Sequence, residues 1–221
     1  MSIHIHNRIP ITETFPPLLS IGSNDYWKRA FDSLEKPYKD QLEAAVSIAK
    51  HTSTPSPTVN GIQESIIQVA RQRQKECVDK LWSFKRHSGE VVFLRDIMEN
   101  ITTWIHRFKE VVDVAVQYDS VHAALPWAGI RFLLQVAVKD VETFVATADN
   151  LETITQIMAC FRAFEHYYLR QRSGSMVQVS MERALTILYA NILEFLSRTI
   201  RYYQTSTIGI PADQHCRGIA C

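Results

Sequence analysis

The sequence lacks the glycine-rich loops that bind phosphate groups through backbone amides. Neither GxxxxGKS/T nor GxGxxG occurs in its 221 residues, and only 7 residues are glycine. The GxSxG elbow of serine hydrolases and the DDxxD magnesium cluster of all-helical prenyl-diphosphate enzymes are also absent. We therefore predict no catalytic residues and favour a non-enzyme, although a catalytic triad that assembles across the fold stays open.

Cysteine is scarce, and its spacing excludes the common cysteine-based sites. No CxxC pair and no framework of a small secreted domain is formed by Cys77, Cys160, Cys216 and Cys221. The N-terminus carries no secretory signal pattern, so we predict reduced thiols in a cytoplasmic protein. Cys160 falls among the core positions of a predicted helix, where we interpret it as a small buried hydrophobic residue.

Metal-ligand patterns are weak as well. The candidate ligands are His4 with His6, close to the N-terminus, and His122 with Asp119, beside a helix start that Asp119 can cap. The two cysteines of the tail have no histidine or further cysteine at zinc-site spacing. We therefore predict no metal and no cofactor.

An excess of charge of either sign is missing too. The 24 Lys and Arg residues nearly balance the 23 Asp and Glu residues, which leaves a net charge of +1. Nucleic-acid binding needs a clustered positive face, so we expect no nucleic-acid partner. A predicted helix at 61–87 gathers basic side chains from Arg71 to Arg86. We interpret it as a solvated face because acids are interleaved, and membrane association through it is possible but not favoured.

Helical periodicity dominates what the sequence does contain. Apolar residues recur every three or four positions and no hairpin signal interrupts them, so we predict an all-α, single-domain bundle of about six to eight helices. The principal helices are predicted at 90–118, 121–138, 150–170 and 180–203. A shorter helix is predicted from Asp140, and Asp149-Asn-Leu-Glu152 is interpreted as the capping box of the next one. The bundle spans 23–206, between a flexible leader, 1–22, and a flexible tail, 207–221.

The predicted helix at 121–138 is the centre of this bundle. It is apolar nearly all the way round, with only His122, Arg131 and Gln135 as interruptions, so it has no solvent face. Pro126 must either kink the chain or open the helix at its first turn, and we describe the element as a buried, proline-kinked helix. A membrane span is the alternative, but an arginine inside a bilayer is costly.

The candidate site consists of polar and aromatic residues in and around this helix: His122, Trp127, Arg131 and Glu165. Because a buried charge needs a partner, we favour structural pairing within the core, with Glu165, Asp113 or Asp119 as the acid. A ligand pocket lined by the four residues is the alternative, either in a small-molecule-binding protein or in an unrecognised enzyme.

Three blocks of the sequence carry a family resemblance. They are Asp25-Tyr-Trp-Lys-Arg-Ala-Phe-Asp-Ser-Leu34, Asp119-Ser-Val-His-Ala-Ala-Leu-Pro-Trp-Ala-Gly-Ile-Arg-Phe-Leu-Leu134 and Phe164-Glu-His-Tyr-Tyr-Leu169. Together they resemble the N-terminal helical domain of fungal NACHT-type NTPases, the NWD family, and related fungal domains of unknown function. The resemblance covers most of the chain, from Asp25 to Tyr203.

This resemblance implies a non-catalytic signalling module. In the relatives, the domain is a helical N-terminal part of intracellular, NLR-like receptors, some of them linked to non-self recognition or cell death. It implies a protein partner or a homo-oligomer. The sequence holds no P-loop, so the NTPase activity of the relatives is not carried over, and the family has no established catalytic residues to transfer. We expect a stand-alone or truncated signalling module.

Overall fold

The computed structural model describes residues 26–51, 59–77, 82–86, 88–112, 122–136, 141–165 and 175–208. Within these ranges the chain forms seven α-helices and one two-stranded antiparallel sheet, which confirms the all-α bundle. The leader, 1–22, and residues 209–221 of the tail lie outside the described residues. In chain order, the elements are α1 Tyr26–Ser33, α2 Lys36–His51, α3 Val59–Glu76, β1 Ser83–Lys85, β2 Val91–Phe93, α4 Leu94–Val112, α5 Ala124–Gln135, α6 Val141–Phe164 and α7 Met176–Ile208.

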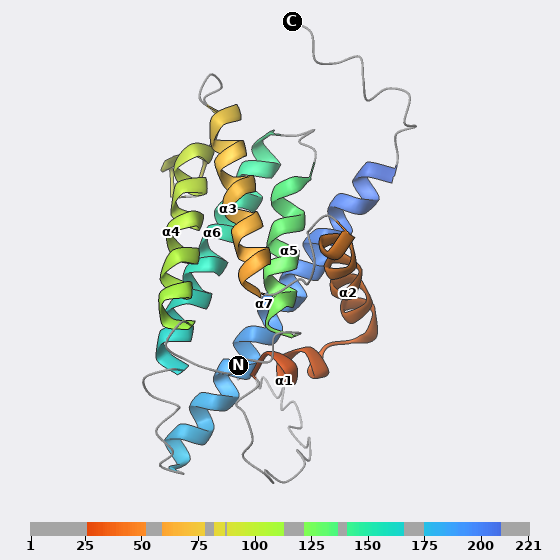
Figure 1. Ribbon diagram of the computed structural model, residues 1–221, viewed down its shortest axis with the longest axis vertical. Coiled ribbons are helices and arrows are strands. Elements are labelled where there is room, and N and C mark those ends of the chain that lie inside the picture. The colour runs from red at the N-terminus through yellow and green to blue at the C-terminus, as the bar shows by residue number, and fades with distance from the viewer. Residues whose placement is uncertain are drawn as a thin grey trace, which may run out of the picture.

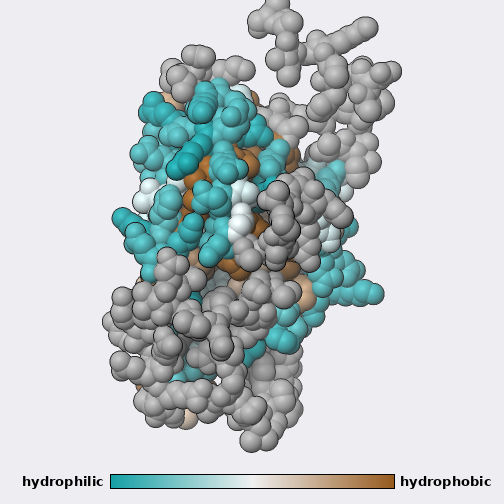
Figure 2. All heavy atoms as spheres, in the orientation of Figure 1, coloured by the Kyte–Doolittle hydropathy of each residue, from teal (hydrophilic) through white to brown (hydrophobic). Residues whose placement is uncertain are grey.

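The helices pack around α5. Helix α4 packs on both α3 and α6, and α5 packs on α2, α3 and α7 (Figure 1). Helix α7 crosses the bundle diagonally and contacts α1, α2 and α5, while its N-terminal end projects beyond the other helices in this view (Figure 1). On the face seen in Figure 2, hydrophilic side chains cover most of the described surface, as expected when amphipathic helices turn their apolar stripes inward.

The central position of α5 is confirmed by its burial. Ten of its twelve residues are buried, and only Phe132 and Gln135 are more accessible. Pro126 is the third residue of the helix, so the first turn accommodates it, where its missing N–H breaks no intrahelical hydrogen bond and no kink is needed. The helix is shorter than the predicted 121–138. Among the described helices, none has the length and apolar character needed to cross a bilayer.

A short hairpin lies where the sequence predicted helix. Strands β1 and β2 pair antiparallel, with Phe84 opposite Val92, and Gly89 turns the chain at φ 90°. Glycine tolerates this left-handed conformation at no steric cost, and Val91-Val92-Phe93 is β-branched and aromatic. The prediction of no hairpin was therefore wrong, as was the single helix at 61–87: α3 ends at Glu76, and α4 begins at Leu94 rather than at residue 90.

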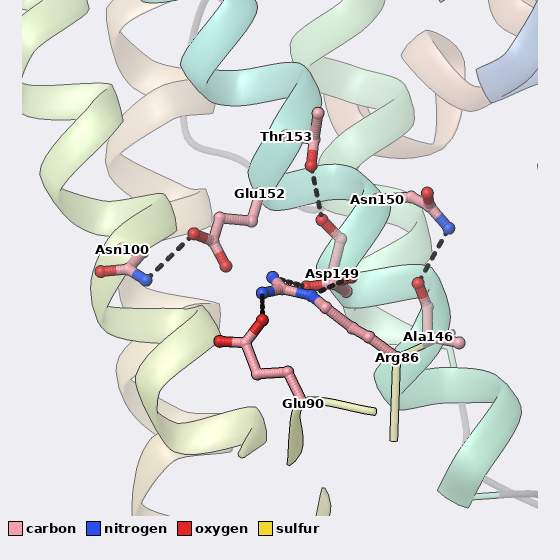
Figure 3. Close-up of polar contacts among 8 residues, drawn as sticks. All are labelled: Arg86, Glu90, Asn100, Ala146, Asp149, Asn150, Glu152 and Thr153. Atoms are coloured by element: carbon pink, nitrogen blue, oxygen red, sulfur yellow. Dashed lines mark hydrogen bonds and ion pairs between the residues drawn. The ribbon is translucent and has the colours of Figure 1, made fainter. Parts of the chain in front are cut away.

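Helix α6 is continuous where the sequence predicted two helices. The expected capping box is wrong, because Asp149 lies in the middle of α6 and binds Arg86 of the hairpin, with an Nη2–Oδ1 distance of 2.5 Å (Figure 3). Hydrogen bonds to Asp149 and Glu90 raise the pKa of the Arg86 guanidinium. One turn further on, Glu152 accepts a hydrogen bond from Asn100 of α4 at 3.0 Å, and burial raises the pKa of this carboxyl (Figure 3).

Two further predictions about the late helices need correction. Cys160 was expected in the core, but its side chain is exposed on α6. Helix α7 begins four residues before the predicted 180 and continues past 203 to Ile208. Its early start exposes a surface that the sequence did not predict.

Candidate interaction surface

The first turns of α7 expose apolar side chains to solvent. Ser175 caps the helix by accepting a hydrogen bond from the Gln178 amide at 3.2 Å, which satisfies one of the free N–H groups of the first turn. Met176 is 84% exposed and Val177 is 67% exposed. A shallow, open groove of about 380 Å³ lies along these turns, lined by Met176, Val177, Ser180, Met181 and Ala184. We call these five residues the α7 strip.

The α7 strip carries no charge, and its edge is polar. All seven residues from Ser175 to Met181 are uncharged. The first acid of the helix, Glu182, accepts a hydrogen bond from the Gln178 side chain at 3.2 Å and lies 4.0 Å from Arg29 of α1. Exposed apolar patches bordered by polar residues mark contact sites on proteins, so the strip is a candidate interaction surface.

Immediately beyond the strip, α7 joins a buried polar cluster. Glu165, at the end of α6, pairs with Arg162 at 2.9 Å, and both side chains are buried, at 5% and 7% exposure. Glu165 also accepts a hydrogen bond from the Tyr189 hydroxyl of α7. The Tyr189 ring stacks on Trp27 of α1, with centroids 3.9 Å apart and planes 3° from parallel. Because every charge in the cluster has a partner, it stabilises the junction of α1, α6 and α7.

Tyr26 borders the same cluster. Its side chain is buried, and its hydroxyl finds no hydrogen-bond partner among the described residues. Burial raises the pKa of the Tyr26 phenol, and the negative charges of Glu182 and Glu165 raise it further. The phenol therefore stays protonated at neutral pH, and no catalytic base arises from it.

The structure divides the four candidate site residues between two environments. Glu165 belongs to the cluster of α1, α6 and α7, and its partner Arg162 was not singled out by the sequence. Trp127 is fully buried on α5, and its ring packs edge-on against that of Phe108, with ring centroids 4.9 Å apart. Arg131 lies one turn further along α5, where burial lowers the pKa of its guanidinium.

His122 precedes α5, and its ring centroid lies 5.5 Å from that of Phe31. None of the four candidate residues lines the groove beside the α7 strip. A second groove, of about 360 Å³, lies between α2 and the C-terminal part of α7 and is also lined by other residues, among them Tyr38, Arg198 and Arg201. The ligand pocket near Trp127 and Arg131 therefore stays a prediction.

No metal centre is formed by the part of the chain that the structure describes: His, Cys, Asp and Glu side chains nowhere gather there in a group of three or more. His4, His6, Asp119, Cys216 and Cys221 lie outside the described residues, so the structure does not test them as ligands.

Comparison with known families identifies the family of this chain. A family model of the N-terminal domain of NWD NACHT-NTPases matches residues 23–215. The chain therefore belongs to this family. No curated protein and no solved structure matches it.

In this NACHT N-terminal domain, the three sequence blocks supply core residues rather than an exposed site. The first block forms α1, with Trp27 buried; the second forms α5, with Trp127 buried; the third begins at Phe164 and contains the buried Glu165. The α7 strip lies outside all three blocks. The sequence signals the strip only through the uncharged run 175–181. The apolar residues of this run continue α7 but do not belong to the buried stripe of that helix.

Proposed function

We propose that this chain is a non-catalytic signalling module in which the α7 strip binds a protein partner. Membership of the NACHT-NTPase N-terminal family supports a role as a module of receptor-type proteins. The resemblance to intracellular, NLR-like receptors supports a cytoplasmic site of action and a role in non-self recognition or cell-death signalling.

The observation that carries the proposal is the exposure of Met176 and Val177 at the end of a long helix. Methionine is flexible and polarisable, so it adapts to different partner surfaces. The strip comprises five side chains of one helix. The surface area that these side chains can bury is far smaller than the roughly 800 Å² per partner of a stable complex. We therefore expect a weak, transient association, or one in which the strip is part of a larger contact.

The test compares two substitutions of exposed valines. Val177→Gln changes the strip, whereas Val91→Gln changes β2, where the valine is 51% exposed. Self-association is measured by light scattering, and binding to a receptor that carries the same domain is measured by pull-down and titration. We expect Val177→Gln to weaken association roughly tenfold, the effect of losing one contact of about 1.4 kcal/mol.

The Val91→Gln variant should bind like the unmodified chain, and both variants should unfold within about 0.5 kcal/mol of it, because exposed positions contribute little to stability. Equal weakening by both substitutions, or a strictly monomeric chain without any receptor binding, contradicts the proposal.

A further inference from the structure

We propose that residues 15–21 of the leader, Phe-Pro-Pro-Leu-Leu-Ser-Ile, bind the α7 strip of the same chain. The contact keeps the strip covered until a partner displaces it. That competition rests on the proposed function, whereas the contact itself can be tested without any partner.

The described part of the chain begins at Tyr26, close to the strip. Tyr26, the first residue of α1, lies close enough to Glu182 of α7 for that carboxylate to raise the pKa of the Tyr26 phenol. Arg29, one turn further along α1, lies 4.0 Å from the same Glu182. Met181 of the strip is the sequence neighbour of Glu182, and Val177 lies about 7.5 Å from Glu182 along the helix axis.

The connection is long enough for this contact. Four residues lie between Ile21 and Tyr26 in the sequence, and the five extended Cα–Cα steps that join them span up to about 17 Å. This span of about 17 Å exceeds the roughly 7.5 Å along the α7 axis between Glu182 and Val177. A tether this short also holds the segment at an effective concentration in the millimolar range, so a small contact area is sufficient for binding.

The two surfaces match in chemistry. Residues 15–21 contain no charge and carry four large apolar side chains, Phe15, Leu18, Leu19 and Ile21. The strip is likewise uncharged, so the contact buries no unpaired ion. Two consecutive prolines restrict the free segment, which lowers the conformational entropy that binding costs.

A second copy of the chain is the competing occupant. Association between separate molecules has no tether, and it must offset the loss of translational and rotational freedom. Five side chains on one helix provide much less than the roughly 800 Å² per partner that a stable interface buries. The tethered leader avoids that cost, and the size of the strip therefore favours it.

Methionine oxidation tests whether the leader covers the strip. In the full chain, Leu18→Asp with Leu19→Asp places two charges in the proposed segment, and Ile3→Asp with Ile5→Asp places the same charges outside it. Peroxide oxidation is followed by mass spectrometry at Met176 and Met181, with the buried Met98 and Met158 as internal controls for an intact fold.

We expect oxidation at Met176 and Met181 to be at least roughly threefold faster in the first variant, and unchanged in the second, because oxidation follows exposure. Equal rates in the unmodified chain and both variants overturn the proposal. Faster oxidation at Met98 as well would show loss of the core, and the cysteine experiment below then decides.

A disulfide experiment locates the contact and identifies the occupant. With Cys160, Cys216 and Cys221 replaced by serine, Leu18→Cys is combined either with Val177→Cys in the strip or with Val91→Cys in β2. With oxidised glutathione as the oxidant, we expect a disulfide within one chain to form at least about tenfold faster in the strip pair, because docking raises the local thiol concentration. Equal rates in both pairs overturn the proposal, and a disulfide between two chains assigns the strip to a second copy instead.

Either result leaves the proposed function testable. No partner is present in these experiments, so a failed leader contact does not remove partner binding. Conversely, a chain that binds no partner can still hold its leader on the strip.

Discussion

The two ends of α7 are similar in composition but opposite in environment. In the part from Leu185 to Ile200, the apolar residues at every third or fourth position are buried against α1, α2 and α5. In the part from Met176 to Ala184, apolar residues of the same kind lie in solvent. Helix continuity is the same in both parts, since one hydrogen-bonded helix spans them.

The difference shows that neighbours, not hydropathy, decide which part of a helix is core. The buried part is held by the stack of Tyr189 on Trp27 and by the close approach of α5. The exposed part has the Arg29–Glu182 contact at its edge, with 46% and 20% exposed side chains. Such an exposed pair is worth less than about 1 kcal/mol, whereas buried apolar packing contributes several.

The largest effect is expected from Glu165→Ala, which removes the acceptor that α6 offers to α7. The change leaves the Arg162 guanidinium buried without its carboxylate and the Tyr189 hydroxyl without this acceptor. We expect the free energy of unfolding to fall by about 3–5 kcal/mol, measured by urea denaturation. Glu182→Ala, at the exposed part of α7, should lower it by less than about 1 kcal/mol. Comparable losses in the two variants would show that the parts of α7 do not differ as described.

The second prediction uses the same substitution at a buried and at an exposed position of α7. Ile200 is fully buried, whereas Ile187 is 52% exposed. We expect Ile200→Ala to lower the free energy of unfolding by about 2–5 kcal/mol, because it leaves a cavity next to α5. Ile187→Ala should change it by no more than about 0.5 kcal/mol. Thermal and urea unfolding measure both, and a large loss at Ile187 would mean that another segment covers that face.

The helical elements could be predicted because their apolar stripes are long and regular. The predicted core of 90–118 and of 121–138 corresponds to α4 and α5, although α4 begins at Leu94 and α5 is shorter than predicted. The hairpin could not be predicted in the same way, since strands of three residues are too short to show alternation. Its Arg86 binds Asp149, 63 positions away, and such a partner cannot be deduced from local sequence.

The candidate site shows the same limit. Glu165 was singled out as a polar residue near the core, but its partners, Arg162 and Tyr189, were not. Tyr189 in turn stacks on Trp27, which lies far away in the sequence. Arg162 was not singled out, because nothing in the local sequence indicates that its side chain is buried. The α7 strip was missed for the converse reason: its apolar residues follow a helical pattern, and only the packed structure shows that no described helix covers them.

The smallest effect is expected where α5 meets the buried part of α7, at Gly129. A methyl group built on Gly129 would lie 3.4 Å from Leu196 and 3.7 Å from Ile200, which is ordinary van der Waals contact. Gly129→Ala therefore removes a flexible residue from a helix without overlap, and we expect a gain of up to about 1 kcal/mol in the free energy of unfolding. Gly129→Leu, by contrast, should lose about 1–3 kcal/mol or more, because the larger side chain must displace Leu196. Urea denaturation of the two variants measures how closely α7 is packed; a loss with alanine would show that the helices approach even more tightly than these distances indicate.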